Sequence, residues 1–185
     1  MPEDLRAVII GAGRVAPGLA RAINNAPGVT LVGVADNDLP RAEVLGNKLG
    51  VKAVGNYQEF LDDPNVDVAV LALPHWLHHQ VAIECCKAGK HVYVEKPLAN
   101  TLEEADEMIA AAEAQHVRLF AAHTQRFFAS TILARRMLEQ GAIGAPVYAT
   151  DTWYKNFGLE GRPAWFLDRR KGGGMWLMNG AHMID

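Results

Sequence analysis

Cysteine is almost absent from this chain, and its two cysteines, Cys85 and Cys86, are neighbours. Adjacent cysteines provide neither a CxxC pair nor a disulfide framework, so the sequence favours a reducing, cytoplasmic environment. No partner base is evident for either thiol. We therefore interpret both as buried helix residues and not as nucleophiles.

Long runs of charged or apolar residues are also missing. The net charge is −3, and the densest basic patch is only Arg169-Arg170-Lys171, which argues against a nucleic-acid-binding surface. No apolar run approaches the roughly 20 residues of a membrane-spanning helix, and the acidic residues 1–4 do not resemble a signal peptide. The sequence therefore predicts a cytoplasmic protein that binds neither nucleic acid nor membranes.

Hydrophobic residues make up 50% of the chain, and short β-branched runs alternate with helical stretches up to about residue 120. The short runs are continuously apolar, which is typical of strands covered by helices on both faces. A capping box of Thr101 and Glu104 marks one helix start. This order predicts a doubly wound parallel sheet of the α/β class with right-handed crossovers. The expected strands are residues 7–10, 30–35, 52–54, 66–73, 91–94 and 117–121, and the expected helices are residues 15–25, 40–49, 57–61, 77–88 and 102–115.

The pattern changes after Arg126. We expect a helix over residues 130–140 and then an alternating, strand-like run over residues 147–154. Two domains are predicted, an α/β domain over residues 1–125 and the beginning of a second domain over residues 126–185. The remaining residues are too few for an independent substrate domain, so we expect a longer chain or a partner to complete it.

A glycine-rich turn, Gly11-x-Gly13-x-x-Ala16, follows the first expected strand and opens a helix, which is the context of a dinucleotide fingerprint. Gly11 permits the tight turn, Gly13 lets the backbone approach a pyrophosphate, and Ala16 lets helix and strand pack closely. The helix N-terminus favours the phosphates. An ordinary glycine turn is the alternative. Asp36, about 20 residues on at a strand end, favours the cofactor site because its carboxylate can accept both ribose hydroxyls.

The residues around Asp36 favour NAD over NADP. Asn37 and Asp38 follow it with no adjacent arginine, and negative charge at this place repels a 2′-phosphate. NADP stays open because Arg14 or Arg41 could reach the phosphate. The cofactor contacts expected in this part of the chain are Gly11, Gly13, Arg14, Val15 and Asp36.

The triplet Glu95-Lys96-Pro97 follows the expected strand at residues 91–94. The carboxyl edge of a parallel sheet is where such folds bind their ligands. Pro97 favours an extended backbone at Lys96. A lysine that is partly desolvated has a pKa below its ordinary value of about 10.4 and can act as a proton acceptor. Taken alone, the triplet is better explained by a surface lysine paired with Glu95.

Further motifs follow in a defined order. They are Leu73-Pro74-His75-Trp76-Leu77-His78, Glu95-Lys96-Pro97, Gln125-Arg126-Phe127, and Gly172-Gly173-Gly174 leading to His182-Met183-Ile184-Asp185. Together with the fingerprint, this order resembles the Gfo/Idh/MocA oxidoreductases over essentially the whole chain. The resemblance implies a Rossmann domain followed by an α+β domain with an open, mostly antiparallel sheet. It also implies an NAD(P)-dependent dehydrogenase that acts on a small-molecule substrate as a homo-oligomer.

The resemblance implies catalytic roles for Lys96 and His182. The His182 imidazole would take the hydroxyl proton while hydride leaves the same carbon, and a purely structural histidine is the alternative. Arg126 is a candidate for substrate or inter-domain hydrogen bonds, with a salt bridge to a helix as the alternative. Trp165 is one of several aromatic residues of the kind that floor ring-substrate pockets. Further cofactor contacts are expected from the loop after the fourth strand and from the triplet, namely Pro74, His75, His78, Glu95 and Lys96.

The chain departs from the family pattern at Met178, which stands where many members have an acidic residue four positions before the histidine. Asn179 is then left to contact the substrate or to orient the ring. Leu73 and His75 are also atypical of the loop that contains them. No metal site is expected, because the histidines of that loop have no carboxylate or thiolate beside them.

Three functions stay open. The first is a dehydrogenase acting on a secondary alcohol of a sugar, polyol or cyclic diol. The second is a dihydrodiol dehydrogenase, because Trp176, Met178 and the missing acid suit a less polar pocket. The third is a non-catalytic, dinucleotide-sensing regulator, which the family resemblance allows. The presence of Lys96 and His182 favours an enzyme.

Overall fold

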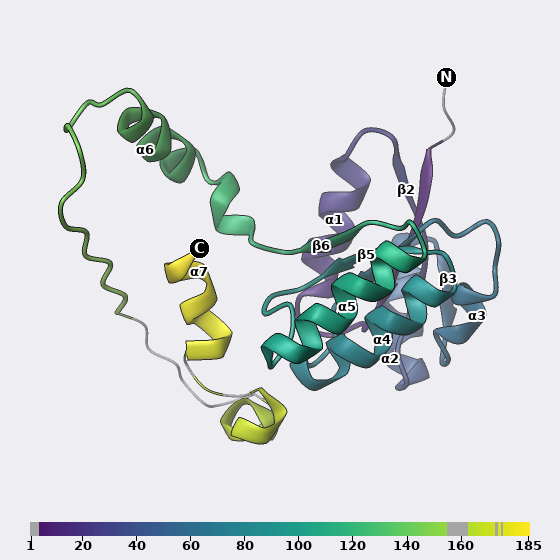
Figure 1. Ribbon diagram of the computed structural model, residues 1–185. Helices are drawn as coiled ribbons and strands as arrows, with labels where there is room; N and C mark the ends of the chain where they lie inside the picture. Colours follow the sequence, from purple (N-terminus) through teal and green to yellow (C-terminus); the bar gives the residue numbers. More distant parts are fainter. Residues whose placement is uncertain (1–3, 155–162, 173, 175) are drawn as a thin grey trace. The chain divides into compact units, whose positions relative to one another are not determined.

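The computed structural model describes residues 4–154, 163–172, 174 and 176–185 (Figure 1). Contacts divide the chain into two compact units, Met1–Ala122 and His123–Asp185, and each is described by itself. Within the described ranges, no helix has both the length and the apolar character needed to cross a membrane.

The first unit is built around a six-stranded sheet with the strand order β3-β2-β1-β4-β5-β6. Every neighbouring pair of strands is parallel. The order reverses between β1 and β4, and this topological switch point is where Rossmann sheets bind nucleotides. The predicted doubly wound fold is confirmed. The strands are β1 (Leu5–Ile10), β2 (Val29–Ala35), β3 (Lys52–Val54), β4 (Val68–Leu71), β5 (His91–Val94) and β6 (Leu119–Ala121).

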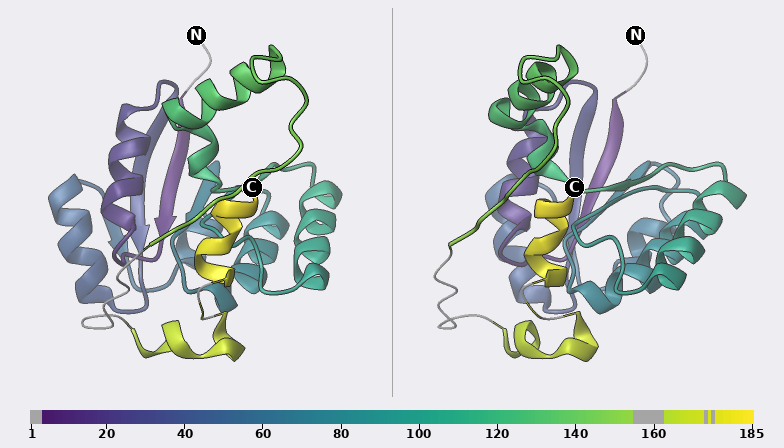
Figure 2. Two further views of the ribbon diagram at one scale, coloured as in Figure 1. Left: turned by 90° about the vertical axis from the view of Figure 1, so that its left-hand side faces the viewer. Right: turned by 60° about the vertical axis from the view of Figure 1, so that its left-hand side comes forward.

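Helices cover both faces of this sheet. Figure 2 shows α1 and α2, purple to blue, on one face and α4 and α5, in teal, on the other. Ile9 and Ile10 of β1 are both buried, and they belong to separate core clusters, Ile9 with residues of α1 and α2 and Ile10 with residues of α4 and α5. Residues 7–10 of β1 and all of β4 are therefore apolar on both faces of the sheet. The helices are α1 (Ala16–Asn25), α2 (Leu39–Leu49), α3 (Gln58–Leu61), α4 (His75–Lys87) and α5 (Leu102–Ala114).

Two helix starts show how the sequence sets the local structure. The Thr101 hydroxyl accepts a hydrogen bond from the Glu104 N–H at 3.2 Å, so the predicted start of α5 is confirmed. The Glu104 carboxylate reaches back to the Asn100 N–H at 2.9 Å. In α4, the helix begins directly after Pro74. His75 therefore lies in the helix and its expected place in a loop is wrong, whereas His78 lies within the helix expected over residues 77–88.

The second unit contains helix α6 (Ala129–Glu139), the short helices at Ala164–Leu167 and Arg169–Lys171, the π-helix Trp176–Gly180 and helix α7 (Ala181–Ile184). The helix expected over residues 130–140 is confirmed as α6. The strand expected over residues 147–154 is wrong, since none of these residues is in a strand. Val147 is 97% exposed and Tyr148 is 86% exposed. An alternating pattern makes a stable strand only where neighbouring strands pair with it.

Candidate cofactor-binding and catalytic site

Gly11 follows β1 in a position that only glycine can occupy. Its φ is +102°, and a Cβ built there would lie 2.5 Å from the Ala72 carbonyl oxygen. The Gly11 N–H donates a hydrogen bond of 2.7 Å to the Ala35 carbonyl at the end of β2. The turn is thus held against the chain that leaves β4 on one side and the end of β2 on the other, at the switch point of the sheet.

Gly13 shows the opposite situation. A Cβ there would meet no heavy atom within 4 Å, so packing inside this unit does not require glycine. Open space beside a bare backbone is what the close approach of a pyrophosphate needs. The N-cap residue of α1, Val15, provides no side-chain cap, so the N-terminal dipole and N–H groups of the helix favour an anion. The described residues therefore fit a dinucleotide phosphate.

Asp36 follows β2 and faces the same turn. Its Oδ2 accepts a hydrogen bond from the Ala12 N–H at 2.8 Å, and its Oδ1 accepts one from the Asp38 N–H at 2.9 Å. The side chain is 7% exposed, and Arg41 Nη1 lies 3.6 Å from its Oδ1. The carboxylate is therefore fixed at the rim of the glycine-rich turn. Arg41 therefore places a positive charge beside Asp36. The sequence had left open whether Arg41 reaches the expected ribose site.

Lys96 follows β5 at the same carboxyl edge of the sheet and is half-buried. Its peptide bond to Pro97 is cis. The Glu95 carboxylate accepts a hydrogen bond from the Lys96 backbone N–H at 3.2 Å. Burial raises the pKa of Glu95, and the Lys96 N–H and the Lys96 charge oppose that rise. The triplet thus places an amine and a carboxyl group at the edge where Asp36 and Gly11 also lie.

His78 connects two of the loops at this edge. Its Nδ1 lies 2.8 Å from the Pro97 carbonyl oxygen, and its Nε2 lies 3.0 Å from the Leu73 carbonyl oxygen. The side chain is fully buried, and this burial lowers the pKa of His78 against the opposing effect of its carbonyl partners. Because both ring nitrogens face backbone carbonyls, His78 joins the loop after β4 to the loop that contains Lys96. The first of these loops ends at Pro74, and α4 begins at His75.

The second unit contains the other predicted site residues. Arg126 forms two contacts of 2.6 Å to the Asp185 carboxylate, so the salt bridge weighed as its alternative role is present. Trp165 packs against Phe166 with ring centroids 4.5 Å apart. Asn179 lies in the π-helix, and His182 lies in α7. The roles of these residues stay predictions.

The sequence interpretation missed a group around Asp185. His123 Nδ1 lies 3.4 Å from Asp185 Oδ1, and the His123 and His182 rings are 6.5 Å apart in an edge-to-face arrangement. One signal was available, since His182 and Asp185 are three residues apart and residues at this spacing share a helix face. No comparable sequence spacing pointed to His123 and Arg126 as partners of Asp185.

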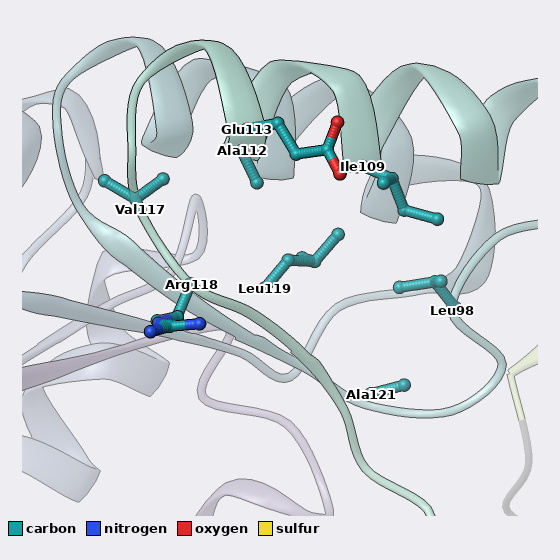
Figure 3. A pocket seen from close by; sticks show the side chains of 8 residues that line it. All are labelled: Leu98, Ile109, Ala112, Glu113, Val117, Arg118, Leu119 and Ala121. Atoms are coloured by element: carbon teal, nitrogen blue, oxygen red, sulfur yellow. The ribbon is translucent and has the colours of Figure 1, made fainter.

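The cysteines, the metal-ligating side chains and a surface groove give no further support for a functional site. Cys85 and Cys86 are buried, and burial raises the pKa of both thiols. No group of three or more metal-ligating side chains gathers among the described residues. Figure 3 shows a groove lined by residues of α5, by Leu98 and by residues 117–119 and 121. It contains none of the predicted site residues.

A parallel sheet with a glycine turn at its switch point and an acidic residue ending β2 defines the dinucleotide-binding Rossmann class. Residues 5–123 match the family model described as "Oxidoreductase family, NAD-binding Rossmann fold". Residues 131–185 match the "GFO/IDH/MocA C-terminal domain". The chain therefore belongs to the Gfo/Idh/MocA family, as its motifs predicted.

Curated relatives of the chain are named dehydrogenases. It is 39% identical over 143 residues to the trans-1,2-dihydrobenzene-1,2-diol dehydrogenase of Mus musculus, covering 76% of this chain and 43% of the relative. It is 30% identical over 189 residues to the scyllo-inositol 2-dehydrogenase (NAD(+)) of Bacillus subtilis, covering 100% of this chain and 53% of the relative. The chain thus spans about half the length of these relatives.

A solved structure is similar across nearly the whole chain. The NAD binding oxidoreductase from Klebsiella pneumoniae has a TM-score of 0.87 and 32% sequence identity, and the match covers 98% of this chain and 51% of that one. The likeness in fold and the family match agree.

Proposed function

We propose that this chain is the nucleotide-binding part, with some of the catalytic residues, of an NAD(P)-dependent dehydrogenase. The substrate class is a secondary alcohol of a sugar, polyol or cyclic diol. One observation carries the proposal: at the switch point, the Gly11 turn is fixed against Ala72 while the Asp36 carboxylate is bonded to the same turn.

The proposal favours NAD over NADP. The Asp36 carboxylate is nearly buried at the rim of the turn, where it would accept the ribose hydroxyls and oppose a phosphate on the 2′ oxygen. Arg41 is engaged by two carboxylates, at 3.6 Å from Asp36 and at 2.8 Å from Asp38. These two contacts reduce its capacity to bind a further anion, and the local charge stays negative.

When bound, the nicotinamide supplies the carbon that accepts or returns the hydride. The residues of the chain have three tasks around it. The glycine turn and the N-terminus of α1 bind the pyrophosphate, Asp36 binds the adenosine ribose, and His78 holds the loop of Lys96 in place. In the oxidation direction, the substrate carbon loses a hydride and its hydroxyl loses a proton, which leaves a carbonyl.

Lys96 and His182 are proposed to handle this proton. Lys96 is half-buried at the carboxyl edge of the sheet, where its amine can hydrogen-bond the reacting oxygen and stabilise its developing negative charge. The His182 imidazole accepts the proton in oxidation and returns it in reduction. Asn179 contributes an amide for orienting the substrate.

A dihydrodiol is the second candidate substrate. Met178 is 7% exposed, and it places a thioether at the position where an acidic side chain would favour a sugar substrate. The mouse relative is named for a dihydrobenzenediol. Both observations support a pocket with apolar walls. A polyol substrate is supported by the relative that is named for scyllo-inositol.

The test is a substrate panel with the intact protein. We expect NADH to form, followed by its absorbance, when NAD⁺ is mixed with one member of a panel of inositols, aldoses and trans-dihydrobenzenediol. NAD binding is measured separately by calorimetry. Binding without turnover of any panel member would support the regulator instead, and failure to bind either dinucleotide would overturn the cofactor site.

A further inference from the structure

The Asp185 carboxylate is held in one position by Arg126. The Arg126 Nε lies 2.6 Å from Oδ2 and its Nη2 lies 2.6 Å from Oδ1, which is the two-point geometry of a guanidinium and a carboxylate. The Asp185 side chain is only 12% exposed. The Arg126 bonds hold the pKa of Asp185 below its ordinary value, so the carboxylate is charged at neutral pH.

One imidazole lies beside this carboxylate, and a second lies beside the first. His123 Nδ1 lies 3.4 Å from Oδ1, with 27% of the His123 side chain exposed. The His182 charge also acts on Asp185 and favours its ionised form, and His182 stacks edge-to-face on His123. The titratable and charged groups that face Asp185 are thus Arg126 and His123 from the start of this unit and His182 from α7.

The Arg126–Asp185 salt bridge could join the end of α7 to residue 126 without any histidine beside it. The positive partner is screened by water, since the Arg126 side chain is 58% exposed, whereas the carboxylate is largely shielded. The charge of the carboxylate, which lies beside His123, is therefore screened less by water than the charge of the guanidinium.

We propose that Asp185 and His123 are positioning residues for His182: Arg126 fixes the Asp185 carboxylate, which orients His123 and stabilises the protonated form of His182. This inference rests on the proposed function of His182 as the proton acceptor. It assigns to Asp185 the electrostatic support that Met178 cannot supply. In oxidation the hydroxyl proton moves to the His182 imidazole, and the resulting positive charge is balanced by Asp185 while the hydride leaves with its electron pair for the nicotinamide.

The test variant is Asp185→Asn, which keeps the shape of the side chain and removes its charge. We expect the rising acid limb of the pH profile of kcat for oxidation to move to lower pH by at least about 0.5 unit, because protonated His182 loses its stabilising neighbour. Asp168→Asn is the matched control, since it removes a carboxylate that pairs with Arg170 in the same unit. Its profile should stay in place.

A second measurement does not depend on turnover. Histidine ring signals of the intact protein are titrated by NMR, with His182→Gln used for assignment, and the midpoint of His182 should fall in Asp185→Asn. If the protein turns over no alcohol, the proposed function fails while this titration still decides the charge coupling. An unmoved His182 midpoint would overturn the inference.

Two substitutions of His123 separate orientation from packing. His123→Asn retains a side-chain nitrogen near the position of Nδ1 and should retain most of kcat. His123→Phe retains the ring without the nitrogen and should lower kcat about tenfold, with KM and thermal stability changed little. Equal kcat values for the two variants would show that His123 has no positioning role.

Discussion

The Asp36 carboxylate at the end of β2 accepts a hydrogen bond from the Ala12 N–H inside the glycine-rich turn, over 2.8 Å and 24 residues of sequence. One side chain therefore shapes the turn that is proposed to bind the phosphates and supplies the proposed ribose ligand. A change at Asp36 is expected to alter both cofactor affinity and cofactor choice.

Replacing Asp36 by Ser together with Asn37→Arg should shift preference towards NADP. The change removes a negative charge from the ribose site, adds a positive one, and releases Arg41 from its contact with Asp36. We expect the ratio of the NADP to the NAD dissociation constant to fall at least about tenfold, measured by calorimetry. Asn37→Arg alone is the control and should have a smaller effect. An unchanged ratio would remove Asp36 from the ribose site.

Lys96→Ala should lower kcat by about 100-fold or more, because the reacting oxygen loses its amine partner. The dissociation constant of NAD should stay within about threefold of the wild-type value, since the phosphate and ribose contacts lie elsewhere. Lys87→Ala, at the exposed C-terminal turn of α4, is the control and should change neither quantity. Loss of NAD binding in Lys96→Ala would instead give Lys96 a structural role.

The buried His78 should make stability depend on pH. Burial lowers its pKa in the folded protein, below the ordinary 6.5. Below pH 6.5 the unfolded chain therefore binds a proton that the folded chain resists, and the free energy of unfolding should decrease as the pH falls. This loss continues until the pH reaches the lower pKa of the folded state.

His78→Asn tests this dependence by denaturant unfolding at pH 7.5 and at pH 5.0. We expect the variant to be about 1–3 kcal/mol less stable at pH 7.5, because a carbonyl at the joint between the loops loses its partner. Its decline between the two pH values should be shallower than that of the wild type. His116→Asn, at an exposed position with φ of +54° that asparagine tolerates, should decline like the wild type.

Gly33 of β2 provides a test of core packing. A Cβ at this position would overlap the ring of Phe60 from α3, so Gly33→Ala should lower the free energy of unfolding by about 1–3 kcal/mol. Combining it with Phe60→Leu should restore part of that loss. Gly18→Ala is the matched control. Gly18 is an exposed residue of α1, and a Cβ built there has no heavy atom within 4 Å. This substitution should stabilise the protein by about 0.5–1 kcal/mol. Equal stability of Gly33→Ala and the wild type would contradict this account of the packing.

Much of the fold could be predicted from local patterns. The strands around Ile9, Val34 and Val70 are continuously apolar because the sheet is covered on both faces, and the predicted order of elements is observed. The strand expected over residues 147–154 is the exception. Its alternation was a local signal, but a strand depends on partners that no local pattern specifies.

The residues of the candidate site could be selected from the sequence, but their contacts could not. Gly11, Asp36 and Lys96 all follow strands, so a parallel sheet brings them to one edge. The contact between His78 and the Pro97 carbonyl could not be predicted from the local sequence, since Pro97 is 19 residues away. Asp185 was missed as a partner of Arg126 because 59 residues separate them.

The sequence by itself determined the order of strands and helices, the glycine turn and the residue types available for proton transfer, since periodicity, chain punctuation and side-chain chemistry are local properties. Only the tertiary structure decided that Asp36 bonds to the glycine turn, that His78 joins two loops, and that His123 lies beside Asp185. Those contacts arise because packing buries polar groups, and a buried polar group must find its partner wherever the fold places one.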